Sequence, residues 1–219
     1  SEEATVYAYH PAYTYDGNGN ATSTALAATG TVGTNAVVSF SLFEGGEGST
    51  GNPTQKANST IPDDGTWAAG KIFSAPGDID YMWESTHPKA SNGKAAGVTS
   101  TSSVSLTMQH ALALVSFAVY KDNTYTNAGK LTKIVLKNTG SGDALKAGTV
   151  TMNIQTGAVA FTTGRAGTFT RLIKDANGVV IPSSDSSAPQ YSILVFPGST
   201  ARNAIEAVFT IDGADYSIP

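Results

Sequence analysis

The sequence has no cysteine and little charge. Without Cys in its 219 residues, disulfides, thiolate zinc sites and thiol catalysis are excluded. Charged residues make up 14% of the chain, against roughly 25% in an average globular protein, so Ser, Thr, Asn and Gly must cover much of the surface. Such a surface is typical of secreted or surface-displayed β-proteins. The formal net charge of −4 argues against nucleic acid as a partner, because nucleic acid binding needs a basic surface.

The chain also lacks long apolar runs and helical periodicity. No run approaches the roughly 20 apolar residues of a membrane-spanning helix, so we expect no transmembrane segment. Only residues 21–28 suggest a helix, and they are few and rich in Thr. Elsewhere, apolar residues alternate with polar ones in short runs, which is the pattern of half-buried β-strands.

Turn residues separate these short runs, most regularly in the second half of the chain. Glycine-containing turns at residues 155–157, 177–178 and 212–213 predict three β-hairpins, because glycine adopts the positive φ angle that tight turns need. Strands at intervals of about 8–12 residues indicate a β-sandwich or barrel rather than a parallel α/β sheet. We therefore predict an all-β protein.

A long polar stretch divides the chain. Residues 87–103 are small and polar, so we predict a connection there between two domains, 1–100 and 101–219. Strand-like sequence also lies at both ends of the chain, at residues 5–9 and 216–218. Either flanking strands lie outside this sequence or strands are exchanged with another subunit, and we expect the N-terminal domain to be the incomplete one.

The longest apolar stretch, residues 104–120, changes the phase of its alternation midway. Because side chains alternate faces along a strand, one uninterrupted strand cannot keep a single buried face through this change. Either both faces are covered, or a bulge near residues 111–115 carries the strand from one sheet into another. Both alternatives imply a two-layer β architecture. The apolar positions are even at first and then odd: Val104, Leu106, Met108, Leu112 and Leu114, then Val115, Phe117 and Val119.

No motif in the sequence predicts a catalytic, cofactor or metal site. Residues 65–72 approach a phosphate-binding loop but place Ile72 where a hydroxyl group must hold Mg²⁺. His10, His87 and His110 are dispersed and have no metal-ligand spacing. We expect His110, inside an apolar stretch, to be a partly buried residue with a satisfied hydrogen bond.

Aromatic residues gather in the first hundred positions. Tyr7, Tyr9, Tyr13 and Tyr15 have the same parity, so they would share one face of an extended segment. Such a stripe could stack on sugar rings, although tyrosines packed on a sheet with their hydroxyl groups at the rim are the more frequent arrangement. The candidate ligand-contact aromatics are Tyr7, Tyr9, Tyr13, Tyr15, Trp67, Tyr81 and Trp83.

Three segments resemble the fimbrillin-like family, the pilus subunits and related surface proteins of the Bacteroides group. Residues 6–11 look like the family's opening strand, and residues 80–83 resemble the end of its N-terminal domain. Residues 106–117 are similar to its histidine-centred signature, L-x-F-x-H-a-h-A-x-h-x-F, with methionine where phenylalanine is common. The residues that match this signature are Leu106, Met108, His110, Ala113 and Phe117.

The resemblance implies two transthyretin-like β-sandwich domains in tandem, and export as a lipoprotein to the outer membrane. It also implies assembly by β-strand addition, in which a strand from one subunit completes a groove in the next. In polymerising members, cleavage after an arginine opens that groove. This sequence has no lipidation cysteine and its first arginine is Arg165, so we expect any lipid anchor or cleavage site to lie upstream of Ser1.

We therefore predict a structural or adhesive subunit of a cell-surface pilus (fimbria), with no catalytic site and no cofactor. Its expected partners are other pilin subunits and, in addition, surface glycans or proteins. The alternative is a surface carbohydrate-binding β-sandwich module that uses the aromatic residues named above. A third hypothesis, an enzyme such as a glycoside hydrolase, needs two carboxylates about 5–10 Å apart. Asp78, Asp80 and Glu84 are candidates for acid–base chemistry, although a solvated strand end explains them more simply.

Overall fold

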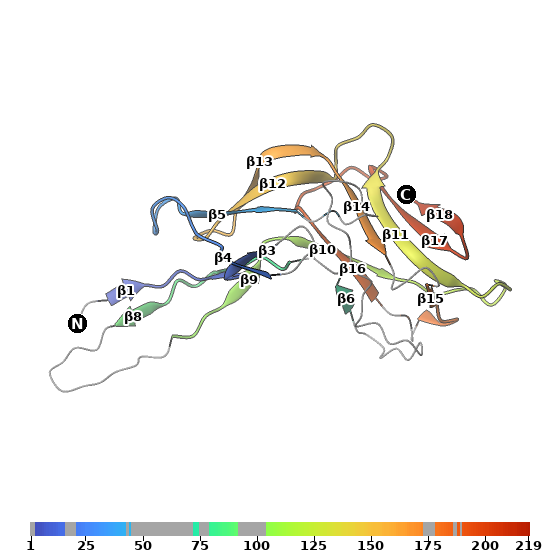
Figure 1. The fold of residues 1–219 in the computed structure, drawn as a ribbon, viewed down its shortest axis with the longest axis horizontal. Helices are drawn as coiled ribbons and strands as arrows, with labels where there is room; N and C mark the ends of the chain where they lie inside the picture. The colour runs from blue at the N-terminus through green and yellow to red at the C-terminus, as the bar shows by residue number, and fades with distance from the viewer. Residues whose placement is uncertain are drawn as a thin grey trace.

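The chain is built from β-strands. The computed structural model describes residues 3–15, 21–42, 44, 72–74, 79–91, 104–172, 178–185, 188 and 190–219. Within them the named elements are all strands, and every strand pair is antiparallel except that of β6 with β16. The predicted all-β class, with several antiparallel sheets, is therefore confirmed. Figure 1 shows an elongated molecule with the N-terminus at one end and the C-terminus toward the other.

The largest sheet has five strands and lies near the C-terminus (Figure 1). Its strands, in spatial order, are β14 (Thr168–Leu172), β11 (Lys130–Asn138), β17 (Ile205–Ile211) and β18 (Ala214–Ile218), with β15 (Val179–Val180) beside β11. The long strand β11 buries Leu131, Ile134 and Leu136. A register shift between Leu131 and Lys133 explains why its buried positions change from odd to even numbers.

Two three-stranded sheets share the core with the largest one. The first consists of β13 (Val159–Ala166), β12 (Lys146–Asn153) and β5 (Val37–Ser41), and the second of β10 (Ala113–Ala118), β16 (Gln190–Val195) and β6 (Ile72–Ser74). In β12 the buried residues Val150 and Met152 alternate with half-buried ones, as expected for a strand with one covered face. In β16 successive residues are buried, so this strand is covered on both faces.

The sheet that contains β10 and β16 packs face to face on the five-stranded sheet. Phe117 of β10 meets Phe209 of β17 edge to face, with ring centroids 5.4 Å apart. Arg171 of β14 is fully buried and donates a hydrogen bond from Nη1 to the carbonyl oxygen of Ser192 on β16, over 2.8 Å. Because these contacts join the inner faces of two sheets, they form the two layers of a sandwich-like arrangement.

Short strands complete the end of the molecule that contains the N-terminus. They form a ribbon of β1 (Glu3–Thr5) with β8 (Lys89–Ser91), a sheet of β2 (Tyr9–His10), β7 (Met82–Glu84) and β9 (Met108–His110), and a hairpin of β3 (Tyr13–Tyr15) with β4 (Ala21–Ala25). The ribbon extends away from the larger sheets (Figure 1). Strands of two or three residues bury little, so this end depends on its contacts with the rest of the chain.

The sheets cross the predicted domain boundary at residue 100. Strand β5 pairs with β12, β7 with β9, and β6 with β16, and in each pair the strands lie on opposite sides of that boundary. One hydrophobic cluster contains buried residues from both parts, among them Val38 and Tyr81 from the first and Ile134 and Phe169 from the second. The division into domains 1–100 and 101–219 stays a prediction, and it does not coincide with a division between sheets.

Residues 104–120 pass from one sheet into another, as their change of phase predicts. Strand β9 pairs with β7, the chain then bends at the buried residues Ala111 and Leu112, and β10 pairs with β16. The second of the two alternatives is therefore confirmed in its essential feature, although a bend between two strands takes the place of a bulge. Leu106 and Leu114 are 47% and 48% exposed, so the even positions at either side of the bend are not all buried.

Two of the three predicted hairpins are confirmed. Strands β12 and β13 are joined by a turn in which Gly157 has φ +67°, and β17 and β18 are joined through Asp212 and Gly213, with φ +50° and +80°. The third, at residues 177–178, is wrong: β14 and β15, the strands on either side of it, both pair antiparallel with β11, so they run parallel to each other and form no hairpin. Asn177 itself lies outside the described residues. Residues 65–71, which approach a phosphate-binding loop, also lie outside them.

Candidate functional site

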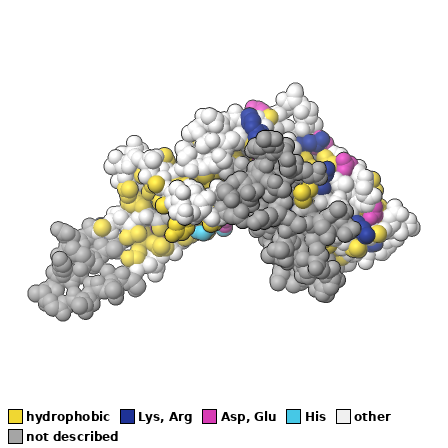
Figure 2. Space-filling view, in the orientation of Figure 1, with side chains coloured by type: hydrophobic (Ala, Val, Ile, Leu, Met, Phe, Trp, Pro, Cys, Tyr) yellow, Lys and Arg dark blue, Asp and Glu magenta, His cyan; other side chains and the backbone are white. Residues whose placement is uncertain are grey.

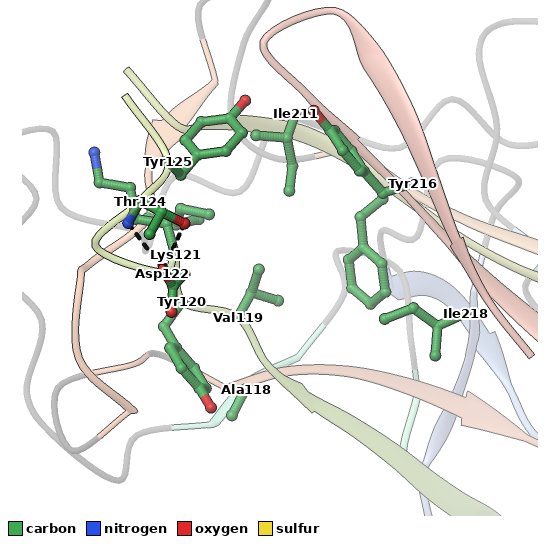
Figure 3. A pocket seen from close by; sticks show the side chains of 12 residues that line it. Ala118, Val119, Tyr120, Lys121, Asp122, Thr124, Tyr125, Ile211, Tyr216 and Ile218 are labelled. Atoms are coloured by element: carbon green, nitrogen blue, oxygen red, sulfur yellow. Dashed lines mark hydrogen bonds between the residues drawn. The ribbon is translucent and has the colours of Figure 1, made fainter. Parts of the chain in front are cut away.

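A cavity of about 430 Å³ opens between the end of β10 and the last hairpin of the chain. This volume falls in the range of about 300–1,000 Å³ that is usual for ligand sites. Figure 3 shows side chains from three parts of the chain directed toward the open space. We call this cavity the β10–β18 groove, and its lining residues are Ala118, Val119, Tyr120, Lys121, Asp122, Thr124, Tyr125, Ile181, Phe209, Ile211, Tyr216 and Ile218.

The groove is open because part of the inner face of the last hairpin is left uncovered. In the hairpin register Phe209 lies opposite Tyr216, and Ala207 opposite Ile218. Directly opposed residues share a face, so Tyr216 and Ile218 lie on the same face of the sheet as buried Phe209. They nevertheless remain 44% and 59% exposed. Strand β18 thus presents an inner, apolar face that no strand of the facing layer covers among the described residues.

Strand β18 borders the groove with Tyr216 and Ile218, and β10 reaches it only at its last residue, Ala118. Among the strands that the structure describes, β10 pairs only with β16 on one side, and β18 pairs only with β17. Natural proteins usually protect such edges with charged residues, proline or bulges, because unpaired backbone groups attract other strands. Strand β10, with sequence Ala-Leu-Val-Ser-Phe-Ala, carries no charge and no proline. The edge of β18 therefore offers backbone hydrogen-bonding groups beside an apolar cavity.

One end of the groove is fixed by hydrogen bonds between a loop and the last hairpin. The Tyr125 hydroxyl group donates to Oδ2 of Asp212 over 2.9 Å, and the backbone N–H groups of Gly129 and Lys130 donate to the same carboxylate over 2.8 and 2.9 Å. The bonds from Lys130 and Gly129 lower the pKa of Asp212, and those with Tyr216 and Asp212 raise the pKa of Tyr125 to about 12. The loop is thus held in one position, which shapes the groove before any ligand binds.

The five signature residues lie on both sides of the bend described above. Met108 and His110 belong to β9, Ala113 and Phe117 belong to β10, and Leu106 precedes both strands. Phe117 faces the sandwich core through its contact with Phe209. The signature residues therefore connect two sheets and do not form a pocket.

The expectation that His110 is partly buried is wrong. Its side chain is mostly exposed, and its Nδ1 atom lies 2.8 Å from Oδ2 of Asp80, so only the expected hydrogen bond is confirmed. The reason is its position in the register, opposite Met82 on the outward side of the short β7–β9 pair. Within the described residues no group of three His, Cys, Asp or Glu side chains is arranged to hold a metal ion.

The aromatic residues proposed as a ligand platform do not form one exposed stripe. Tyr9 and Tyr13 belong to different sheets, and the Tyr9 hydroxyl group donates to the carbonyl oxygen of Leu26 over 2.6 Å. Tyr81 is buried and stacks on Phe40, with ring centroids 3.5 Å apart and planes inclined by 8°. Its ring is therefore not available to a ligand, because the core uses it. Tyr13 is half exposed, Tyr15 is half-buried beside it on β3, and Trp67 lies outside the described residues.

Tyr7 and Trp83 are brought together, with His87 between them. The His87 ring centroid lies 4.8 Å from that of Tyr7 and 6.1 Å from that of Trp83. Gly157 of the β12–β13 turn lies against the Trp83 indole so closely that a Cβ atom there would be 2.0 Å from Nε1. Trp83 is therefore partly covered by that turn, and this cluster connects the short sheets to the larger ones. Figure 2 shows hydrophobic side chains on the surface of the end that contains the short strands, and most of the coloured charged side chains lie at the opposite end.

Glu84 has a structural role that the sequence does not reveal. It is fully buried, and its carboxylate accepts hydrogen bonds from the backbone N–H and hydroxyl group of Thr86, over 2.6 and 2.5 Å, and from the N–H of Thr107, over 2.8 Å. Burial alone would raise the pKa of this carboxyl group, but the bonds from Thr86 and Thr107 lower it below its ordinary value. Glu84 thus joins the segment that follows β7 to the segment that precedes β9, and its carboxylate is not solvated.

Sequence reasoning did not identify the β10–β18 groove. The signal that was present is the alternation of apolar residues over the last hairpin, which includes Phe209, Ile211, Tyr216 and Ile218. Alternation predicts a buried face, however, and only the position of the facing sheet leaves part of that face uncovered. In the part of the chain that the structure describes, no helix has the length and apolar character needed to cross a membrane. No family model matches the chain, and no curated protein is detectably similar to it.

Proposed function

We propose that this chain is a structural or adhesive, non-catalytic subunit of a cell-surface pilus that assembles by β-strand addition. The β10–β18 groove is the single observation that best supports the proposal. It combines an apolar cavity of about 430 Å³ with an edge of β18 that has no neighbour among the described strands. An extended segment from another subunit would supply both what this edge lacks, backbone hydrogen bonds, and what the cavity lacks, apolar side chains.

The energetics favour a strand over a small ligand in this groove. Burial of apolar surface contributes roughly 25 cal/mol for each Å² removed from water, and a strand would cover both Tyr216 and Ile218, which are 44% and 59% exposed. It would also pair backbone groups along β18, at about 0.5–1.5 kcal/mol for each hydrogen bond. A small ligand could fill the cavity but could not pair the length of an edge.

The finer architecture belongs to the same proposal. We propose that the sheets represent two transthyretin-like β-sandwiches in tandem, with fewer strands in the N-terminal one, that share strand pairs and one hydrophobic cluster across residue 100. We also propose that the protein acts at the outer surface of the cell. The short strands β1 to β4, which bury little by themselves, support an N-terminal unit that other strands would complete. The resemblance of residues 106–117 to the fimbrillin-like signature supports the same assignment.

The carbohydrate-binding alternative has less support. Of the aromatic residues on which it depends, Tyr81 is buried, Tyr9 is hydrogen-bonded to the main chain and Trp83 is partly covered by the turn at Gly157. Carbohydrate-binding sites need aromatic faces open to solvent for stacking. A screen of the chain against immobilised glycans tests this alternative, and saturable binding that is lost in the variant Tyr13→Ala would favour it.

Assembly of the purified chain tests the proposed function. The protein is incubated at increasing concentration, and polymers are followed by size-exclusion chromatography and electron microscopy. Ile218→Glu places a charge on the exposed apolar wall of the groove and should abolish polymers. Leu106→Glu is the matched control, because Leu106 is also about half exposed, at 47%, but lies outside the groove, and this variant should assemble normally. Polymers of equal length with both variants, or none with the unchanged chain at any concentration, would contradict the proposal.

A further inference from the structure

We infer that the partner of the β10–β18 groove is a peptide strand with a defined pattern of side chains. It pairs with the free edge of β18 and directs apolar side chains at alternate positions into the cavity. It also carries a basic residue on its outward face, near Asp215. This inference rests on the proposed function, because it concerns the partner of the same groove.

The hairpin geometry identifies the backbone groups that are available. Asp212 and Gly213 both have positive φ angles, as in a two-residue turn of type I′. The residues that flank such a turn form a hydrogen-bonded pair, and hydrogen-bonded and non-hydrogen-bonded pairs then alternate along an antiparallel ladder. From the pairs Ile211–Ala214 and Phe209–Tyr216, the N–H and C=O groups of Asp215 and Ser217 point away from β17. These are the groups that an added strand would meet.

The position of the cavity determines the alternation of the partner's side chains. A strand added at this edge continues the pleat of β18, so every second side chain lies on the same face as Tyr216 and Ile218, which line the cavity. A cavity of about 150 Å³ holds one benzene molecule. At about 430 Å³, the groove therefore has room for two large apolar side chains two residues apart, and a single one would leave much of it empty.

Of the two acidic side chains on the outward face of the hairpin, Glu206 is paired with Lys137 and Asp215 makes no ion pair among the described residues, which favours a basic residue of the partner beside Asp215. Thr210 Oγ1 donates to Asp215 Oδ1 and Ser217 Oγ donates to Glu206 Oε2, both over 2.6 Å. Glu206 also lies 3.1 Å from Lys137 Nζ. A basic side chain beside Asp215 would complete this face, and opposite charges on neighbouring strands stabilise their pairing by about 0.2–1 kcal/mol.

Synthetic peptides added to the full chain test this pattern. A labelled peptide of about eight residues alternates Phe or Leu with Lys and Thr, and a permuted peptide of the same composition places the apolar residues next to one another. Fluorescence anisotropy should show saturable binding of the alternating peptide and affinity at least about tenfold weaker for the permuted one. Ile218→Glu should weaken the alternating peptide by about tenfold or more, because burial of a large aliphatic side chain is lost, and Leu106→Glu should leave it unchanged.

The charge of the outward residue is tested separately. Replacing the outward Lys of the peptide by Glu should weaken binding about two- to fivefold at low salt, and the difference should shrink at about 0.5 M salt because exposed charges are screened. Equal affinity of the alternating and permuted peptides, or a preference for Glu, would overturn the inference. The inference would also be overturned if an apolar dye bound to the chain but none of the peptides did. If the peptides fail in this way but the unchanged chain polymerises and Ile218→Glu abolishes its polymers, only this inference is wrong. If the unchanged chain forms no polymers either, the proposed function fails with it.

Discussion

Gly157 is the point at which the β12–β13 turn meets the Trp83 indole. Its φ angle is +67°, and a Cβ atom built on it would lie 2.0 Å from Nε1 and 2.2 Å from Cε2 of Trp83. Trp83 cannot move freely, because it is a residue of β7 paired with Tyr9 on one side and Gln109 on the other. Gly157→Ala should therefore destabilise the protein for two separate reasons, backbone strain and a steric clash.

The two contributions can be separated with a matched variant. A side chain in the left-handed region costs roughly 1–2 kcal/mol, and forcing extra atoms into a packed contact costs about 1–3 kcal/mol, so Gly157→Ala should cost about 2–5 kcal/mol. Gly140 has nearly the same angle, φ +60°, but a Cβ atom added to it would have no neighbour within 4 Å. Gly140→Ala should therefore show only the backbone cost of about 1–2 kcal/mol.

Urea unfolding of both variants measures this difference. The free energy of unfolding of the Gly157 variant should fall below that of the Gly140 variant by about 1–3 kcal/mol. The fluorescence of Trp83 should also change in the folded Gly157 variant, because the indole must shift. Equal stabilities would refute the reasoning, since they would mean that the turn does not pack on Trp83 and that the short sheets are not held against the larger ones at this contact.

Three further predictions concern the core, a buried acid and an exposed pair. Val38→Ala removes a fully buried side chain of β5 and should cost about 2 kcal/mol, with one unfolding transition in calorimetry rather than two, because the cluster includes residues from both parts of the chain. The pKa of Glu84 is lowered in the folded state, so its carboxylate stabilises the fold at neutral pH and this contribution is lost as pH falls through the folded-state pKa. Glu84→Gln should therefore be less stable than the unchanged chain at pH 7, and urea midpoints should show that the difference shrinks in acid. His110→Ala should change the free energy of unfolding by less than about 1 kcal/mol, because its contact with Asp80 is exposed, and a larger loss in the same assay would show that the pair supports the fold.

Local pattern in the sequence was sufficient to predict the all-β class, two of the turns and the change of sheet within residues 104–120. It succeeded there because side-chain alternation and the φ angles of glycine-containing turns depend on neighbours in the sequence. It was wrong at residues 21–28, which suggested a helix, because Ala21–Ala25 form strand β4. It could not predict that β5 pairs with β12, or β6 with β16. Pairing between distant strands depends on which edges and faces match in space, and several strands in this chain have similar alternation.

The candidate site was less predictable than the fold, for a related reason. Tyr216 and Ile218 look like ordinary members of a buried strand face, and only the absence of a facing strand among the described residues exposes them. His110 and Glu84 show the opposite errors: an apolar stretch suggested burial for the first, and a polar neighbourhood suggested exposure for the second. Both outcomes follow from tertiary contacts, with Asp80 in one case and with Thr86 and Thr107 in the other.

Hydrogen exchange at the edge of β18 tests the proposed strand addition most directly. The amide hydrogens of Asp215 and Ser217 point away from β17 and should exchange rapidly in the monomer. On assembly, or on binding of the alternating peptide, both should become protected by at least about tenfold, while the amide of Val180, in the short strand β15, should change little. Unchanged exchange at Asp215 and Ser217 in polymers or in the peptide complex would contradict strand addition at the β10–β18 groove.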